Sequence, residues 1–215
     1  MSDLNYRVAV AGDEEKVLNF IRKHYYPEEA LTIGISPKEP TKEDEEFSLS
    51  CIPTGLSVVC EDSNKNIVGV LLCHEVDNST LTERKISTET IEDPKWRTIL
   101  TFLNYMEELT SICSRLNVTK GIQFSVLGVD PEQRGKSIGL KMMQKAAENA
   151  LEKKLMAIGS VCTSIFSARI AEKLGMECVA SIPYSEWKNS EGKTIFHPPP
   201  PHDYARCYVK KITNG

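Results

Sequence analysis

The segment from Val126 to Gly139 constrains the fold of this chain most, because it has the pattern of a strand, a compact turn and the start of a helix. Residues that favour strands run up to Asp130-Pro131, and apolar residues recur at three-to-four spacing after the turn. One face of the expected helix carries Ile138, Met142, Ala146 and Ala150. A strand that leads into a helix in this way favours an α/β fold.

The turn inside this segment contains Arg134, Gly135 and Lys136. A turn that enters a helix presents unpaired backbone N–H groups and the positive end of the helix dipole, which suit a diphosphate. Glycine lets the backbone approach such a ligand, and the two basic side chains add positive charge. The turn chemistry alone fits an ordinary connection with solvated basic residues equally well. The turn matches neither a Walker A loop nor the dinucleotide-binding glycine pattern.

The rest of the chain predicts further alternation of strands and helices. We expect strands at residues 6–10, 56–61, 67–76, 121–129, 156–162, 176–184 and 204–212. We expect a first helix between Asp13, as its N-cap, and Pro27, further helices at 42–52, 94–115, 136–153 and 164–174, and loops at 27–42 and 77–90. A hairpin turn at 63–66 makes the sheet mixed. We therefore predict a single α/β domain over residues 1–215.

Composition and charge exclude several classes of protein. The chain has 30 acidic and 26 basic residues and a net charge of −4, whereas a nucleic-acid binder needs a surplus of Lys and Arg. Residues 1–5 lack a signal-peptide pattern, and no apolar run approaches the length of a membrane span. We expect a cytoplasmic monomer with neither a nucleic-acid nor a membrane partner.

The seven cysteines predict neither a disulfide framework nor a metal site. Their number is odd, their spacing is wide, and the sequence has no CxxC motif or Cys/His ligand cluster. Cys60, Cys73 and Cys162 lie in apolar runs, where buried free thiols are expected. We expect no bound metal.

Two short motifs resemble the landmarks of the GNAT superfamily of acetyltransferases. Residues 134–139, RGKSIG, resemble its Q/R-x-x-G-x-G/A signature, with Ser137 in place of the first glycine, and residues 171–176, AEKLGM, resemble its later YEKLGF landmark. The resemblance implies one domain with a mixed, mostly antiparallel sheet of about seven strands, flanked by helices and splayed at the strand before the turn. It implies acetyl-CoA as co-substrate, with the pyrophosphate on the turn and the pantetheine arm along the preceding strand. The implied contacts are Leu127, Gly128, Val129, Arg134, Gly135, Lys136, Ser137, Ile138, Gly139, Ser164 and Ser167.

Three further segments resemble the insect arylalkylamine (dopamine-type) N-acetyltransferases. Residues 164–175 look like their SSxxSARxxxEKLGF segment, residues 24–31 like their HFFxDEPL motif, and residues 196–202 like their proline-rich loop. The resemblance implies acetylation of a small primary amine such as dopamine, serotonin or tryptamine, by direct attack in a ternary complex.

The resemblance also implies catalytic residues, each with a simpler interpretation beside it. Glu29 matches the family's general base, which an amine needs because it is mostly protonated at pH 7; without the resemblance, a solvated loop acid would be the preferred interpretation. Ser167 matches the family's general acid, or it caps a helix. Thr163 stands where the family has a second serine. His202 borders the implied amine pocket and could relay a proton, or it is a surface residue.

Other functions stay open at this point. A polyamine or guanidine-type amine, or a polypeptide, could be the acceptor. Departures from the family pattern at Ala30, Ser137 and Thr163 would also fit a catalytically weak acyl-CoA-binding paralogue. Five aromatic residues could line an amine pocket or belong to the core: Tyr25, Tyr26, Phe47, Phe166 and Tyr184.

Overall fold

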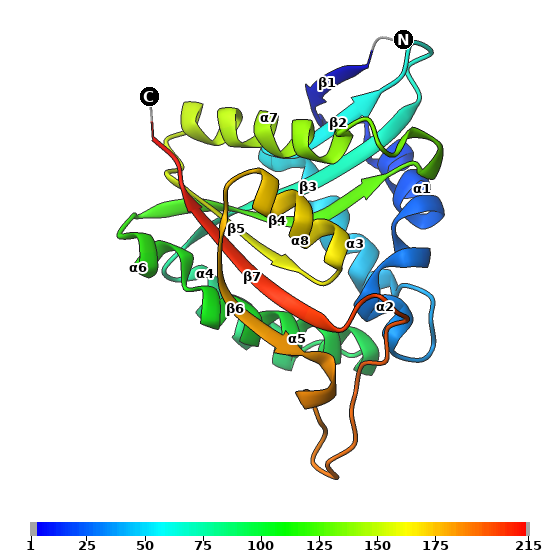
Figure 1. Cartoon of the computed structure of the whole chain (residues 1–215), viewed down its shortest axis with the longest axis vertical. Helices are drawn as coiled ribbons and strands as arrows, with labels where there is room; N and C mark the ends of the chain where they lie inside the picture. The colour runs from blue at the N-terminus through cyan, green and yellow to red at the C-terminus, as the bar shows by residue number, and fades with distance from the viewer. Residues whose placement is uncertain (1–3, 214–215) are drawn as a thin grey trace.

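One seven-stranded sheet organises residues 4–213, which are the residues that the computed structural model describes (Figure 1). Its strands are β1 (Asn5–Val8), β2 (Val58–Glu61), β3 (Ile67–Asp77), β4 (Lys120–Val129), β5 (Ala157–Cys162), β6 (Glu177–Pro183) and β7 (Tyr204–Lys211). The strand order is β1-β2-β3-β4-β5-β7-β6, and only the β4–β5 pair is parallel. This confirms the predicted mixed, mostly antiparallel sheet.

Eight α-helices are described: α1 (Glu14–His24), α2 (Ala30–Gly34), α3 (Lys42–Ser50), α4 (Thr80–Glu89), α5 (Pro94–Thr110), α6 (Ile112–Leu116), α7 (Ile138–Glu152) and α8 (Ile165–Lys173). Single turns of 3-10 helix lie at η1 (Tyr26–Glu28), η2 (Ile52–Thr54), η3 (Pro131–Gln133) and η4 (Tyr184–Glu186). Within residues 4–213, no helix combines the length and apolar character that crossing a bilayer requires.

The strands of the sheet send alternate side chains to opposite faces, and a different set of helices covers each face. On β2, Val58 and Cys60 pack with Met142 of α7, whereas Val59 packs with Val17 of α1. Figure 1 shows α7 and α8 in front of the sheet and α1, α3 and α5 behind it. Six of the seven cysteines are buried in this core as free thiols, including the three predicted ones, and Cys178 is exposed.

Strands β4 and β5 pair over only three residues and then separate. Residues 122–124 of β4 pair with residues 158–160 of β5, after which β4 pairs only with β3 and β5 only with β7. Ser125 is left without a partner in the β3–β4 register, as expected for a β-bulge that bends the strand. The predicted splay before the turn is thereby confirmed, and it opens the sheet at the carboxyl end of β4.

Two predicted segments differ from the structure. Residues 77–90, expected to be a loop, contain α4, which packs on α5 through polar contacts such as Arg84 Nε to Asn104 Oδ1 at 2.6 Å. The single helix expected at 94–115 is divided into α5 and α6 by Ser111, whose φ of 42° is left-handed. The expected loop at 27–42 includes α2.

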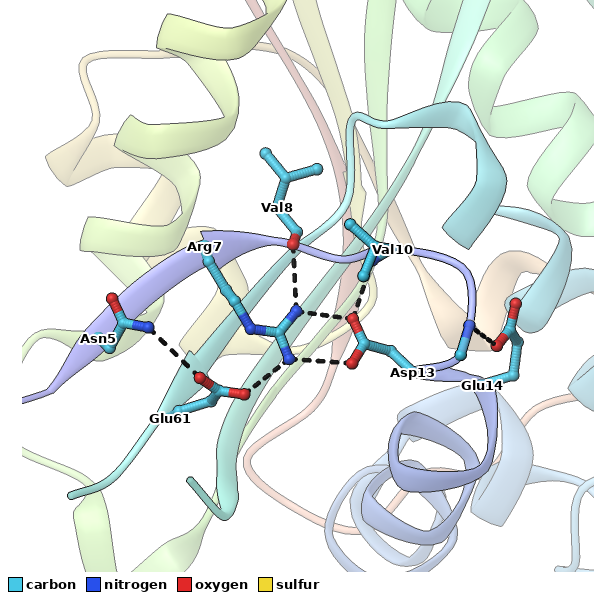
Figure 2. A network of polar contacts seen from close by, with 8 residues as sticks. Asn5, Arg7, Val8, Val10, Asp13, Glu14 and Glu61 are labelled. Carbon is cyan, nitrogen blue, oxygen red and sulfur yellow. Dashed lines mark hydrogen bonds and ion pairs between the residues drawn. The ribbon is translucent and has the colours of Figure 1, made fainter. Parts of the chain in front are cut away.

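Arg7 ties the amino-terminal strand to the first helix (Figure 2). Its guanidinium donates to both oxygens of Asp13, at 2.7 and 2.9 Å, and to Glu61 at 2.6 Å. These contacts lower the pKa of both carboxyl groups. Asp13 stands at the N-cap position of α1, but its carboxylate binds Arg7 and the Val10 N–H instead of capping the helix, so the prediction that it caps α1 was wrong in its chemistry.

Candidate active site

A cleft of about 740 Å³ opens where β4 and β5 separate. Its walls are the carboxyl end of β4, the turn before α7, the start of α8 and the loop at 199–202. Most of the predicted cofactor contacts line it: Leu127, Gly128, Val129, Arg134, Gly135, Ser137, Ile138, Gly139, Ser164 and Ser167. Lys136 does not line it, because its ammonium binds Gln133 Oε1 at 2.6 Å.

The turn before α7 carries a run of free backbone donors. Within the described residues, the N–H groups from Gly135 to Gly139 have no hydrogen-bond acceptor, and the first N–H of the helix that does is that of Lys141, which binds Ser137 O. A run of free N–H groups at the positive end of a fifteen-residue helix is a suitable site for a diphosphate. Gly135 and Ser137 both have left-handed backbone, with φ of 81° and 59°. A left-handed residue at position 137 explains why glycine is the more natural residue there.

The edge of β4 that faces the cleft is also free. Beyond Phe124 this edge has no partner in β5, so peptide groups between Ser125 and Val129 are available to an extended ligand. Gly128 has little room for a side chain, since a Cβ there would lie 3.2 Å from the ring of Phe20 on α1. The close packing of α1 on β4 brings the residues after α1 to the mouth of the cleft.

Glu29 lies at the inner end of the cleft and is only 9% exposed. Its Oε2 accepts hydrogen bonds from the Thr32 backbone N–H at 2.6 Å and the Thr32 hydroxyl at 2.8 Å, so it is the N-cap of α2. Its Oε1 accepts a 2.9 Å hydrogen bond from Thr163 Oγ1. The neighbouring Glu28 is exposed and binds Arg134 at 2.6 Å. The two acids therefore differ completely in environment, and only Glu29 is a buried, positioned carboxylate.

Ser164 and Ser167 meet at the start of α8. Ser164 is the N-cap, because its hydroxyl oxygen accepts from the Ser167 N–H at 3.1 Å. Ser167, for which capping was the alternative interpretation, is not the cap; its hydroxyl donates to Ser164 O at 3.0 Å, and the residue lines the cleft. The 3.0 Å separation of the two hydroxyl oxygens makes them one hydrogen-bonded pair.

His202 is buried rather than a surface residue, at 9% exposure. Its Nδ1 accepts from the Ile165 N–H at 3.4 Å, and its ring contacts Phe166 edge to face at a 5.5 Å centroid distance. Burial lowers its pKa below the ordinary value, although nearby Glu29 acts in the opposite direction. The surroundings of His202 at the wall of the cleft therefore favour the neutral imidazole.

A second, inner cavity lies behind Glu29. Tyr25, Glu29 and Thr163 line both this cavity and the cleft, so the three residues stand at the junction between them. The inner walls include Phe47 and Trp96, whose ring centroids are 5.7 Å apart, and the buried carboxylate of Asp44. Of the aromatic residues considered from the sequence, Tyr25 and Phe47 line this cavity, Phe166 lines the cleft, and Tyr26 and Tyr184 are buried.

The sequence did not identify Asp44, Trp96 or the anchoring role of Tyr184. The Tyr184 hydroxyl donates to Thr163 O at 2.6 Å and holds the loop that carries the Thr163 side chain toward Glu29. Asp44 belongs to a segment with several acids, so no local signal separated it from its solvated neighbours. Trp96 lies in the helix predicted at 94–115, where an apolar side chain most often belongs to the core.

Three solved structures at 30–32% identity to this chain are N-acetyltransferases, whereas no protein-family model matches the sequence. A mosquito arylalkylamine N-acetyltransferase (like 5b) is 32% identical with a TM-score of 0.92, over 98% of this chain and 100% of that one. The Drosophila melanogaster polyamine N-acetyltransferase, which catalyses the formation of N-acetylagmatine, is 30% identical with the same TM-score and the same shares of the two chains. An agmatine N-acetyltransferase mutant in its apo form matches equally, at 30% identity and a TM-score of 0.92, over 98% and 100% of the two chains.

Proposed function

We propose that this chain, which belongs to the family of the insect arylalkylamine and polyamine N-acetyltransferases within the GNAT superfamily, transfers the acetyl group of acetyl-CoA to a small primary amine. The observation that carries the proposal is the position of Glu29, a buried carboxylate at the junction of a cofactor-sized cleft and an inner cavity. A base at such a junction can act on an amine held in the cavity and a thioester held in the cleft.

The cleft fits acetyl-CoA by the chemistry of its walls. The free N–H groups from Gly135 to Gly139, with Arg134 beside them, would bind the diphosphate. The free edge of β4 would pair with the amides of the pantetheine arm, and this arm leads along β4 toward Glu29. Lys136, which binds Gln133 instead, would contribute charge without a direct contact.

Glu29 would be the general base. An amine is mostly ammonium at pH 7, so it must lose one proton before its nitrogen attacks the thioester carbon and a second as the amide forms. Glu29 would accept these protons, directly or through a water molecule. One of them returns to the thiolate that leaves as the C–S bond breaks, and the other goes to solvent.

Ser167 would protonate the departing thiolate. Ala171 stands where many GNAT enzymes have the tyrosine that does this, and its methyl side chain has no proton to donate. Ser167 lines the cleft and its hydroxyl is coupled to that of Ser164, which gives it a partner for proton exchange. His202, whose surroundings at the same wall favour the neutral form, could relay a proton between Glu29 and solvent. Thr163 would position Glu29.

Two classes of small amine suit the inner cavity. An arylalkylamine such as dopamine, serotonin or tryptamine would lie against Phe47 and Trp96, and one similar protein is named as an arylalkylamine N-acetyltransferase (like 5b). A non-aromatic amine such as agmatine would bind to the cavity's carboxylates, and another similar protein catalyses the formation of N-acetylagmatine. We place such a reaction in the cytoplasm with the chain as a monomer, as its sequence led us to expect.

The experiment is a free-thiol release assay with acetyl-CoA and a panel of aromatic amines, diamines and amino acids, repeated with Glu29→Gln. We expect the variant to lose about 100- to 10,000-fold in kcat while binding acetyl-CoA normally in equilibrium titration. Glu28→Gln is the matched control for kcat at saturating acetyl-CoA, since it removes the adjacent charge outside the inner cavity. Unchanged turnover in Glu29→Gln would refute the role of Glu29. Binding of acetyl-CoA without thiol release from any amine would favour the alternative, a catalytically weak acyl-CoA-binding protein.

A further inference from the structure

The inner cavity has more negative than positive charge on its walls. Its charged lining consists of Glu29, Asp44, Glu107 and Arg84. Arg84 is already paired with Glu107 and bound to Asn104. Among residues 4–213, neither Glu29 nor Asp44 has an ion-pair partner. The space between these two carboxylates therefore attracts positive charge.

Asp44 differs from Glu29 in its hydrogen bonds. Both oxygens of Glu29 accept hydrogen bonds from the protein, whereas only one oxygen of Asp44 does. Asp44 lies in the first turn of α3, and the residue is 8% exposed. Its backbone N–H donates to Thr41 Oγ1, the N-cap of the helix, at 3.1 Å. Its Oδ1 accepts from the Tyr26 hydroxyl at 3.1 Å. Its Oδ2 has no hydrogen-bond partner in the described part of the chain. Oδ2 is not fully buried, and because Asp44 lines the inner cavity, a ligand there can supply the hydrogen-bond donor that the protein does not.

The charged neighbours of Asp44 do not neutralise it. Lys95 on α5 is near, but its ammonium donates to three backbone carbonyls, those of Thr32, Pro37 and Glu39. Glu45 on the same helix is bound to Arg22 at 2.6 Å. Burial and the charge of Glu29 raise the pKa of Asp44 to about 7, with smaller effects from Tyr26, Lys95 and Glu45. A raised pKa of this origin is the mark of a carboxylate that lacks a counter-charge.

We propose that Asp44 is the specificity-determining residue of the amine site and binds a second cationic group at the far end of the substrate. The substrate class is then an alkyl diamine or guanidinoalkylamine, whose reacting amine lies at Glu29 and whose distal ammonium or guanidinium donates to Asp44 Oδ2. This inference rests on the proposed function and narrows its substrate.

The walls between the two carboxylates suit the chain of such an amine. Phe47 and Trp96 offer apolar surface to methylene groups, and aromatic faces also attract a guanidinium or ammonium. A phenyl or indole ring placed against Asp44 would instead leave Oδ2 buried beside an apolar surface with no donor. The arrangement therefore favours a dication over an arylalkylamine.

The first test uses the unaltered protein and matched pairs of amines. Putrescine is compared with butylamine, cadaverine with pentylamine, and agmatine with butylamine, so that each pair differs in the distal cation. With acetyl-CoA saturating, we expect kcat/KM to be about 10- to 100-fold higher for at least one dication than for its matched monoamine, which is the effect of a hydrogen bond to a charged group. The difference should lie mainly in KM. Equal values across all pairs would overturn the inference.

The second test uses Asp44→Asn, which keeps an acceptor for Tyr26 but removes the charge. We expect this advantage of the dication to disappear while kcat/KM for butylamine and phenethylamine stays within about threefold. Glu46→Gln is the control, because it removes the same charge from the exposed side of α3 and should leave all the ratios unchanged. An equal loss for every amine would assign Asp44 a structural role only and overturn the inference.

The two proposals fail in different ways. One outcome is that the protein acetylates phenethylamine or tyramine and yet shows no higher kcat/KM for any dication than for its matched monoamine. In that case the substrate assignment is wrong and the acetyltransferase activity stands. If no amine releases thiol from acetyl-CoA, the proposed function itself is wrong.

Discussion

Thr163 Oγ1 donates a 2.9 Å hydrogen bond to Glu29 Oε1, joining two residues that are 134 positions apart in the chain. Thr163 follows β5, and Glu29 lies between η1 and α2, so the bond connects the two sides of the junction between the cleft and the inner cavity. The Tyr184 hydroxyl fixes the same loop through Thr163 O. The orientation of the proposed base thus depends on a hydroxyl supplied by the opposite half of the chain.

Replacing Thr163 tests this dependence. Thr163→Val removes the donor at nearly constant volume, and we expect kcat/KM to fall by about 10- to 100-fold, as for the loss of a hydrogen bond to a charged group. Thr163→Ser keeps the hydroxyl and should restore kcat/KM. An unchanged kcat/KM in Thr163→Val would show that Thr163 does not position the base.

The serine pair at the start of α8 gives a comparison of two similar hydroxyls. Ser167→Ala removes the proposed acid, and we expect kcat to fall by about 100-fold with little change in acetyl-CoA affinity or thermal stability. Ser164→Ala removes the N-cap of α8 and should lower the unfolding free energy by about 1 kcal/mol. Turnover and thermal melting, measured on both variants, separate catalysis from capping. A larger loss of kcat in Ser164→Ala than in Ser167→Ala would reverse the assignment.

The exposed pair of Glu28 and Arg134 competes with the cofactor. Arg134 Nη2 lies 2.6 Å from Glu28 Oε2, and a bound diphosphate would have to take the guanidinium from this carboxylate. We expect Glu28→Gln to lower the dissociation constant of acetyl-CoA by about two- to fivefold at low ionic strength, an effect that salt should weaken. Isothermal titration at two salt concentrations measures it. Glu132→Gln, which removes a charge from η3 without touching the pair, serves as control, and an equal gain there would show a general charge effect.

Much of the fold could be predicted because its signals are local. The hairpin of β2 and β3, the strand–turn–helix of β4 and α7, and the last strand each carry their own periodicity or turn residues. Helix α4 carries no apolar stripe, and it is held by polar contacts to α5 such as that of Arg84 with Asn104. A helix of this kind depends on a partner distant in sequence, so periodicity could not reveal it.

The candidate site also combines residues that a local sequence signal reveals with residues that it does not. Glu29 and the turn at 134–139 could be proposed from short motifs, whereas the burial of Asp44 depends on how α3 packs beside η1 and α5. Ser164 and Ser167 are both good capping residues, and only the backbone geometry shows which of them caps α8. Charge burial and cap geometry are properties of the assembled fold.

Ser137 is expected to reduce stability relative to glycine. Its φ of 59° costs a residue with a Cβ about 1–2 kcal/mol, and the extra chain entropy of glycine offsets part of the difference. We therefore expect Ser137→Gly to raise the unfolding free energy by about 0.5–1 kcal/mol in urea denaturation. Ser137→Ala keeps the strained backbone and should give no gain. A loss of stability in Ser137→Gly would mean that the serine hydroxyl makes a contact worth more than the strain.

Asp44 makes stability depend on pH in a direction that can be checked. Its folded pKa of about 7 lies above the value near 4 for an unfolded chain, so the folded state binds the proton more tightly. The resulting stability is complete below pH 4 and is lost as the pH rises through 7. Asp44→Asn imitates the protonated form, so we expect its unfolding free energy to exceed that of the unaltered protein by an amount that grows by a few kcal/mol between pH 4 and pH 8. Urea denaturation across this range measures the difference. Added putrescine should narrow it at pH 8, because a bound cation favours the charged carboxylate; a difference that does not change with pH would show that Asp44 stays charged without cost in its cavity.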